Sequence, residues 1–284
     1  MSELKDYFHN RFLLIATRHG KEKVMGPLLQ DSIGVKYFTS DEVDSDMFGT
    51  FTGEVPRPDN PIETLRKKCL HFMEVCNVDL AIASEGSFGP HPTLMMLPAD
   101  EEWVILIDKK NDLEIIARAI STATNFNGAY VNTFDELNQF ASAVLFPSHA
   151  LILRDKQEGN QKIIKGITDI SKLYEQFDEI KKSFGRVFVE TDMRAMFNPM
   201  RRKVIAEATT QLIHKIMNIC PCCATPGYDV FIAEPGLPCA ICGLPTRSVL
   251  QLHYTCKKCN HQSSVLYPNQ KKKEDPMYCD HCNP

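Results

Sequence analysis

The cysteines of this chain are crowded into its C-terminal end, and this crowding constrains the fold more than any other feature of the sequence. Nine of the 11 cysteines lie in the last 65 of the 284 residues. A pair of thiolates three positions apart can hold one side of a metal ion from a tight turn, and a second pair completes a tetrahedron. Two closed four-cysteine zinc sites, structural rather than catalytic, are therefore predicted from four C-x-x-C pairs: Cys220/Cys223, Cys239/Cys242, Cys256/Cys259 and Cys279/Cys282.

The spacing leaves the combination of the pairs open. The stretch VLQLHYTCKKCNHQSSVLYP is typical of strand, knuckle and strand, and CAICGLP before it is typical of an opposing knuckle. We therefore expect a zinc-ribbon-like domain in which the second and third pairs share one ion and the outer pairs share the other. An interleaved arrangement, with the first pair joined to the third, is the alternative. The ninth cysteine, Cys222, is a spare ligand or, as we favour, a bystander.

Composition places the rest of the chain among ordinary globular proteins, with 43% apolar residues, 24% charged residues and a net charge of −4. No apolar stretch reaches the ~18 residues needed to span a bilayer, and MSELKDYFHNRF lacks the apolar core of a signal peptide. We expect a cytoplasmic protein without membrane segments, in which thiols stay reduced. The change in composition near Asn218 predicts an α/β body at 1–218 and a Cys-rich domain at 219–284.

The charge of the Cys-rich domain bears on its partners. Residues 220–284 carry six Lys/Arg and five Asp/Glu, and eight thiolates with two Zn²⁺ bring the formal charge to about −3. Phosphate attraction, which drives nucleic-acid binding, is weak for such a domain. We therefore disfavour nucleic acid as a partner and favour a structural role or docking of a protein.

The body is predicted to be an α/β fold with a mixed sheet and flanking helices. Apolar runs such as Phe12–Ala16 and VDLAIAS are typical of buried strands, and EEWVILIDKKNDLEIIARAIS is typical of a hairpin. PIETLRKKCLHFMEVC has apolar residues at i, i+3 and i+4 spacing and predicts an amphipathic helix capped by Asn60. Residues 41–60 are predicted to be a long loop.

Three predicted strands end in polar residues, within ATRHGKE, ASEGSFG and ETDMRAMFNPMRR. Ligands of open α/β sheets gather at the carboxyl ends of strands. We therefore expect a common site there, formed by Thr17, Arg18, His19, Lys21, Ser84, Glu85, Ser87, Asp192, Arg194, Arg201 and Arg202.

This set of residue types suits phosphate and a metal ion. Glu85 and Asp192 could hold Mg²⁺, because hard cations prefer carboxylate oxygens. Ser84, Ser87 and neighbouring N–H groups could cradle phosphate oxygens, and arginines at a helix N-terminus make an anion site. The alternatives are that Glu85 lies in a tight turn, and that the arginines pair with Glu190, Asp192 or the acidic loop at 41–54.

Long motifs, among them IATRHGKEK, ASEGSFGPHP, ETDMRAMFNP and EDPMYCDHCNP, resemble a bacterial family of unknown function, domain-of-unknown-function family 6671. The resemblance covers nearly the whole chain and implies no activity.

Roughly residues 12–155 also resemble, more distantly, the inosine/xanthosine triphosphate pyrophosphatases. The resemblance is carried by ATRHGKEK, by Glu63-Thr64 at a helix start and by ASEGSFG. It implies that Lys21, or Lys23 in its place, contacts phosphate, that Glu63 is a second magnesium ligand and that Glu85 is a ligand or base. The chain departs from that family at Arg18-His19, where an asparagine is usual, and at Glu85, where two carboxylates are frequent.

Together these features lead to a hypothesis of a Mg²⁺-dependent hydrolase that cleaves a phosphoanhydride in a nucleotide or another phosphorylated small molecule. Its catalytic residues would be Lys21, Glu85, Asp192 and Arg194, with magnesium on Glu63 and Glu85. The alternative is a non-catalytic module that binds a nucleotide or protein and docks through the zinc domain.

Overall fold

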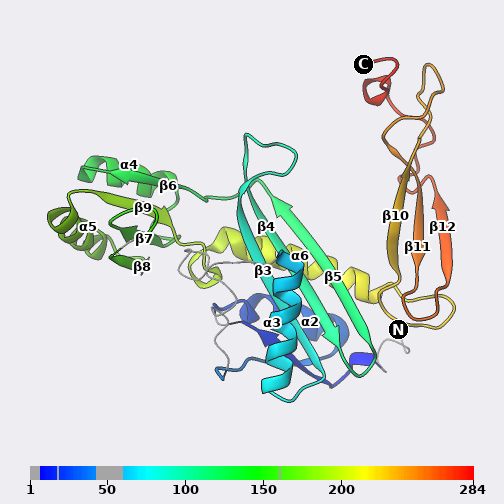
Figure 1. The fold of residues 1–284 in the computed structure, drawn as a ribbon, viewed down its shortest axis with the longest axis horizontal. Helices are drawn as coiled ribbons and strands as arrows, with labels where there is room; N and C mark the ends of the chain where they lie inside the picture. Colours follow the sequence, from blue (N-terminus) through cyan, green and yellow to red (C-terminus); the bar gives the residue numbers. More distant parts are fainter. Residues whose placement is uncertain (1–6, 18, 43–59, 160) are drawn as a thin grey trace. The chain divides into compact units, whose positions relative to one another are not determined.

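The computed structural model in Figure 1 describes residues 7–17, 19–42, 60–159 and 161–284. Arg18 and most of the loop predicted at 41–60 lie outside these residues. The chain divides into two compact units, a body of Tyr7–Ile213 and a C-terminal unit that includes His214–Pro284. The predicted mixed α/β organisation is confirmed, although the strands of the body form two sheets instead of one.

The first sheet of the body has five strands in the order β2-β1-β3-β4-β5. Strands β1, β2 and β3 are parallel, whereas β4 runs antiparallel to both β3 and β5. The β4–β5 pairing confirms the predicted hairpin. The strands are β1 (Phe12–Ala16), β2 (Lys36–Phe38), β3 (Leu80–Pro90), β4 (Pro98–Asp108) and β5 (Leu113–Ser121).

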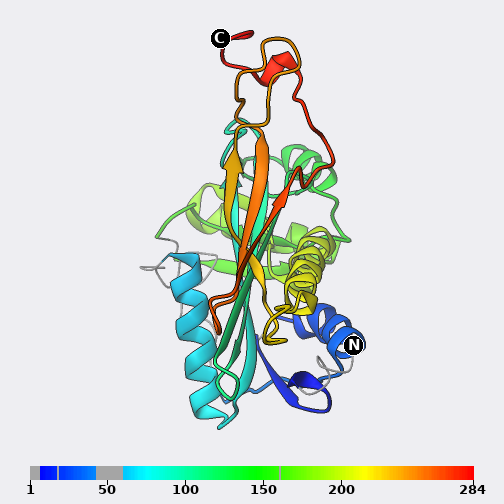
Figure 2. The ribbon, with the colours of Figure 1, turned by 90° about the vertical axis from the view of Figure 1, so that its right-hand side faces the viewer.

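Helices cover both faces of this sheet. The predicted amphipathic helix is α3 (Pro61–Val75), and its Asn60 cap accepts a hydrogen bond from the Glu63 N–H. Its buried side chains Leu65, Cys69, Phe72 and Met73 pack on one face of the sheet, where each fully buried apolar side chain contributes about 1.5–3 kcal/mol. Helix α2 (Glu22–Ile33) lies on the opposite side of the sheet from α3 (Figure 2).

Strand β3 corrects the prediction of a strand exit at Glu85. It continues through the whole of ASEGSFG to Pro90, because β4 pairs with it from Leu80↔Asp108 to Pro90↔Pro98. The parallel partner on its other side ends earlier, with the pair Ala16↔Ala83. The polar residues therefore begin where β1 leaves the sheet, but they lie within a strand and not in a turn.

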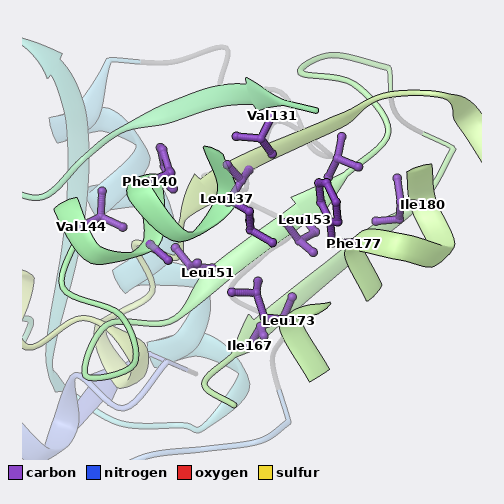
Figure 3. Close-up of a cluster of buried hydrophobic side chains, with 13 residues drawn as sticks. Val131, Leu137, Phe140, Val144, Leu151, Leu153, Ile167, Leu173, Phe177 and Ile180 are labelled. Atoms are coloured by element: carbon purple, nitrogen blue, oxygen red, sulfur yellow. The ribbon is translucent and has the colours of Figure 1, made fainter. Parts of the chain in front are cut away.

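The second sheet of the body is antiparallel, in the order β6-β9-β7-β8, and carries α4 and α5. Its core joins Leu137 and Phe140 of α4 to Leu173 and Phe177 of α5 across Leu151 (Figure 3). Thr133 and Asp169 cap the two helices, and Gly185 ends α5 in the left-handed conformation. The elements are β6 (Gly128–Val131), α4 (Phe134–Ala143), β7 (Leu151–Arg154), β8 (Ile163–Ile167), α5 (Ile170–Phe184) and β9 (Val187–Thr191).

The C-terminal unit is built on a three-stranded antiparallel sheet, β10-β11-β12. Its strands are β10 (Asp229–Pro235), β11 (Val249–Thr255) and β12 (Gln262–Leu266). A short helical turn, η2 (Ala195–Phe197), and then helix α6 (Pro199–Met217) precede it, and η3 (Pro276–Tyr278) follows it. Among the described residues, no helix combines the length and apolarity that a bilayer crossing requires.

Candidate functional site

The eight paired cysteines form two clusters, each of which could hold a metal ion. One cluster is Cys220, Cys223, Cys256 and Cys259, and the other is Cys239, Cys242, Cys279 and Cys282. The favoured pairing of the second with the third C-x-x-C is therefore wrong, and the interleaved alternative holds. Cys222 is exposed and belongs to neither cluster.

The sheet explains this pairing. The first knuckle precedes β10 and the third follows β11, so antiparallel pairing brings both to one end of the sheet. The second knuckle follows β10 and the fourth follows β12, at the other end. Strand β11 spans Val249–Thr255, and at about 3.4 Å per residue it keeps the second and third knuckles roughly 20 Å apart. The sequence-based pairing overlooked this separation.

Distances between the sulfur atoms fit a tetrahedral ion. In the first cluster, Cys220 Sγ lies 3.7 Å from Cys259 Sγ, and Cys223 Sγ lies 3.6 Å from Cys256 Sγ. In the second, the corresponding pairs Cys239–Cys282 and Cys242–Cys279 are 3.9 and 3.6 Å apart. Zinc–sulfur bonds of ~2.3 Å in a tetrahedron place the sulfurs ~3.8 Å apart, whereas a disulfide needs ~2.05 Å. The clusters are therefore shaped for an ion, and all the cysteines are free thiols.

All four knuckles share one backbone turn. In each, the N–H of the residue after the second cysteine donates to the carbonyl of the first, as in Ala224 to Cys220 (2.9 Å) and Gly243 to Cys239 (3.1 Å). The N–H groups of Cys222 and Ile241 also donate to the sulfurs of Cys220 and Cys239. Hydrogen bonds to sulfur favour the thiolate, which is the form that binds metals.

A second candidate site is a buried polar centre in the body. Lys21, at the start of α2, donates from Nζ to Ser84 Oγ (2.9 Å) and to the Ser84 carbonyl (3.2 Å). Its Nζ also lies 3.5 Å from Glu102 Oε2. On the other carboxylate oxygen, Glu102 Oε1 accepts from Arg201 Nε of α6 (2.6 Å). Glu102 is fully buried, so these two cations compensate a charge that would otherwise be costly to bury.

Burial perturbs the ionisation of this centre. Desolvation lowers the pKa of Lys21 to about 8, although Glu102 opposes the change. Desolvation, with repulsion from Glu102 next, raises the pKa of the neighbouring Asp100 to about 8. Within the described part of the chain, Asp100 Oδ1 and Glu102 Oε2 are buried without a hydrogen-bond donor. A buried lysine and acid whose pKa values are shifted toward neutrality are typical of functional sites.

The register of β3 and β4 sets the geometry of this centre. Gly86 is paired with Glu102, and a Cβ added at Gly86 would stand 2.3 Å from Glu102 Oε1 and 2.4 Å from an Arg201 nitrogen. Only glycine leaves room for the ion pair. Because successive strand residues face opposite ways, Ser84 faces Lys21 while Glu85 belongs to the face that α3 covers.

The predicted residues Asp192 and Arg194 are separate from this centre. Asp192 is buried, accepts from the Gly166 N–H (3.0 Å) and forms an ion pair with Arg194 (2.6 Å), whose guanidinium also lies over the Phe197 ring. This is the pairing that the sequence analysis gave as the alternative to a ligand site. Glu190, which lies nearby on β9, pairs with Arg154.

The remaining predicted residues are not part of the ion-pair group. Thr17 is buried, and its Oγ1 accepts from the His19 N–H, while the His19 carbonyl accepts from Met196 N–H and so joins the β1–α2 loop to η2. Ser87, Glu63 and Arg202 are exposed, as is Lys23, the alternative to Lys21. Arg18 lies outside the described residues.

No magnesium cluster accompanies these residues. Among the described residues, the two cysteine clusters are the groups of three or more His, Cys, Asp or Glu that could hold a metal. Neither Asp192 with Glu85 nor Glu63 with Glu85 belongs to such a group.

Asp100 and Glu102 were missed by the sequence analysis. A signal for them exists in PADEEWVILID, because both fall on the same alternation as the buried Val104 and Leu106. A carboxylate in phase with the buried face of a strand must find a cation in the fold. The sequence alone does not indicate which cation.

Comparison with curated proteins gives no match. Among solved structures, one similar to this chain is the crystal structure of protein VC0702 from Vibrio cholerae, with 10% identity over 74% of this chain and 96% of that chain and a TM-score of 0.32. Similarity at this TM-score carries no argument about function.

The family comparison does find a match, in agreement with the first of the two resemblances. The pattern described as Domain of unknown function (DUF6671) covers residues 68–284, which include β3, β4, α6 and all eight paired cysteines. This chain therefore belongs to the DUF6671 family.

Proposed function

We propose that the C-terminal unit holds two structural zinc ions. The observation that carries the proposal is the spacing of 3.6–3.9 Å between sulfurs within each cluster. Four thiolate ligands leave no open coordination position, which is typical of a structural site. Reduced thiols of this kind persist in the cytoplasm, where we place the protein.

Metal analysis of the purified protein tests this proposal. We expect two zinc ions per chain, one ion per chain in Cys256→Ser or Cys279→Ser, and two again in Cys222→Ser, the matched control. A content of two ions in either ligand variant contradicts the assignment, as does a tightly bound metal other than zinc.

We propose for the body a Mg²⁺-dependent hydrolase of nucleotide phosphoanhydrides, acting beside the buried centre. The observation that carries this proposal is the Lys21–Glu102–Arg201 ion-pair group at the start of α2, with two buried carboxylate oxygens that lack donors. A helix N-terminus attracts phosphate through its free N–H groups, and α2 begins beside this group.

Solvent exposure decides which side chains can contact the substrate. Lys21 is only 4% exposed and engaged with Ser84, so its role in the proposal is to hold Ser84 and Glu102 in place. Lys23, the second residue of α2, is exposed. It is therefore the ammonium group that can reach a phosphate. Glu85 is only 9% exposed and lies on the α3 face of the strand, but its charge acts against desolvation to raise the pKa values of both Lys21 and Arg201, and in the proposal it is the base that takes the proton of the attacking water.

The proposed magnesium ligands, Glu63 and Glu85, belong to no group of three or more metal-binding side chains among the described residues, so the ion would be held mainly by waters and substrate phosphates. Mg²⁺ commonly uses one or two carboxylates together with such ligands. When bound, the ion would neutralise phosphate charge and favour ionisation of the attacking water. Asp192 and Arg194 are left out of the proposed chemistry because they are paired with each other.

Incubation of the zinc-loaded protein with a panel of nucleoside triphosphates and diphosphates and Mg²⁺, followed by phosphate and pyrophosphate detection, tests the proposal. We expect turnover that falls by at least about 100-fold in Glu85→Gln, the usual loss when a general base is removed. Glu74→Gln, an exposed position on α3, serves as the control and should retain activity. Absence of turnover for every nucleotide would reject the hydrolase.

The alternative is a binding module, and one observation favours it. Ile241, Leu244, Met277 and Tyr278 are exposed by 45–77% and all belong to the knuckles of the second cysteine cluster or their flanks. Exposed apolar side chains gathered on one structure are typical of protein docking sites. This alternative predicts that nucleotides raise the melting temperature of the protein without being cleaved.

A further inference from the structure

A cavity of about 560 Å³ lies between the end of the β3–β4 hairpin and the second sheet of the body. Its volume is in the range of small-molecule sites. The proposed hydrolysis uses none of its walls. The residues that matter for what it can bind are Gly89, Phe126, Asn127, Gln157, Phe188 and Glu190.

One part of the cavity wall is aromatic side chain and bare backbone, and another part is aliphatic, from Pro90, Met95, Met96, Leu97 and Pro98. Two aromatic side chains, Phe126 and Phe188, line it together with Gly89 and Gly128. A Cβ added at Gly128 would stand 2.8 Å from Phe188 Cζ, so glycine there is what allows the Phe188 ring its position. Ring faces and bare backbone present surfaces on which a planar group can stack.

Polar groups of the wall are held in place by hydrogen bonds to neighbouring parts of the body. Asn127 Oδ1 accepts from the Gly128 N–H (2.9 Å). The main chain of Gln157 is held at both ends, since its N–H donates to Tyr130 Oη (3.2 Å) and its carbonyl accepts from Arg154 (3.1 Å). In the described part of the chain, the Asn127 amide nitrogen and the Gln157 side-chain amide have no hydrogen-bond partner in the protein. A few oriented polar groups in an apolar pocket fix the orientation of a ligand.

Charge decides which part of a ligand fits. Glu190 is the one charged residue in the described cavity wall, so the wall offers no cation to an anionic group. Arg154, the cation nearest to Glu190, is engaged in an ion pair with it. Cations are found instead in the neighbouring buried polar centre. Arg201 Cζ lies 4.9 Å from the centroid of the Phe88 ring, and this centroid lies 5.8 Å from that of Phe126 in the cavity wall. A ligand with a neutral planar end and an anionic end matches this order of groups.

We infer that the cavity binds the base of a nucleoside, stacked on the half-buried Phe126 and hydrogen-bonded by Asn127, Gln157 and Glu190. The direction of the phosphate chain, toward the Lys21–Arg201 side, rests on the proposed function, but binding of the base does not.

Nucleosides without phosphate test the inference separately from hydrolysis. Isothermal titration of adenosine, guanosine, cytidine and uridine into the full-length, zinc-loaded protein without Mg²⁺ should give a dissociation constant of about 0.1 mM for at least one, the value typical of a ligand of this size. Gly89→Phe is the blocking variant, because Gly89 lines the cavity and a Cβ added there meets nothing within 4 Å, so the position has room for a larger side chain. Lys110→Phe, which adds the same ring at the exposed β4–β5 turn, is its control.

We expect Gly89→Phe to weaken nucleoside binding at least 10-fold at an unchanged melting temperature, and Lys110→Phe to bind as the unmodified protein does. Failure of all four nucleosides to bind at 5 mM would overturn the inference, even if nucleotides are cleaved. Equal binding by Gly89→Phe would overturn it too, and so would binding of only an aliphatic probe such as laurate. Nucleoside binding without any nucleotide cleavage would leave the cavity assignment intact and reject the hydrolase.

Discussion

Replacement of Asp100 by asparagine is predicted to stabilise the protein at neutral pH. Burial, with repulsion from Glu102 next, raises the pKa of Asp100 to about 8 in the folded chain, against about 3.9 in an unfolded one. Between these values the folded state holds a proton that the unfolded state has lost, so folding becomes less favourable by about 1.4 kcal/mol for each unit of rising pH. At pH 7 this amounts to up to about 4 kcal/mol.

Asparagine cannot ionise, and its amide brings a donor to a centre where Asp100 Oδ1 and Glu102 Oε2 lack one. We therefore expect Asp100→Asn to match the unmodified protein near pH 4 and to exceed it progressively as the pH rises to about 8. Above that pH, Asp100 of the unmodified protein is ionised in both the folded and the unfolded state. The stability difference between the two proteins therefore stays constant.

Urea unfolding of the two proteins at several pH values between 4 and 9, followed by tryptophan fluorescence, measures this difference. Asp112→Asn is the control, because Asp112 is exposed in the β4–β5 turn and has a positive φ that asparagine also tolerates. A stability difference that does not change with pH would refute the raised pKa. A variant that is less stable at every pH would refute the view that the carboxylate is a burden on folding.

Three further predictions follow from the same structure. Gly86→Ala should lower the free energy of unfolding by about 1–3 kcal/mol, because its Cβ overlaps Glu102 and Arg201, whereas Gly89→Ala, measured by the same urea titration, should change it little. The pKa of Lys21 is about 8 in the folded protein, below its ordinary 10.5. Between these values the unfolded state binds more protons, so stability rises with pH there, by up to about 3 kcal/mol. A Lys21→Met protein that lacks this rise in urea titrations supports the assignment, and one that retains it contradicts the assignment. Removal of the metals by a chelator should abolish amide-exchange protection of β10, β11 and β12 while the body keeps its own, and retained protection of these strands would show that the sheet does not depend on metal.

Features encoded within one element were predictable from the sequence. Asn60 caps α3 as predicted, because capping requires only residues within one turn of each other. The eight metal-binding candidates were predictable for the same reason, since each knuckle is a turn of four residues. Only their combination failed, because it depends on the direction of β10, β11 and β12 over their whole length.

The strand exits illustrate a different limit. Polar composition at Ser84–Ser87 predicts a strand exit, with a tight turn as the alternative, yet pairing with β4 holds these residues in an extended strand. The polar composition reflects the loss of the neighbouring strand on one side of β3, where β1 ends at Ala16. It does not indicate that β4, the hairpin partner on the other side, continues to pair with β3 as far as Pro90.

Lys21, Ser84 and Arg201 were expected at one site, but the carboxylate that pairs with the two cations was not, because it comes from a distant part of the chain. Lys21 and Glu102 are joined only when β4 pairs with β3, and Arg201 reaches Glu102 across 99 residues of sequence. Each of these groups would be costly to bury alone, so α2, β4 and α6 must arrive together for any one of them to be stable in place. The centre is therefore sensitive to the position of α6, and the close approach of Gly86 leaves no space for a compensating shift. A ligand whose phosphates draw Arg201 away from Glu102 would therefore act on the packing of α6 against the sheet, and such a ligand should alter amide exchange along α6 as well as at the β1–α2 loop.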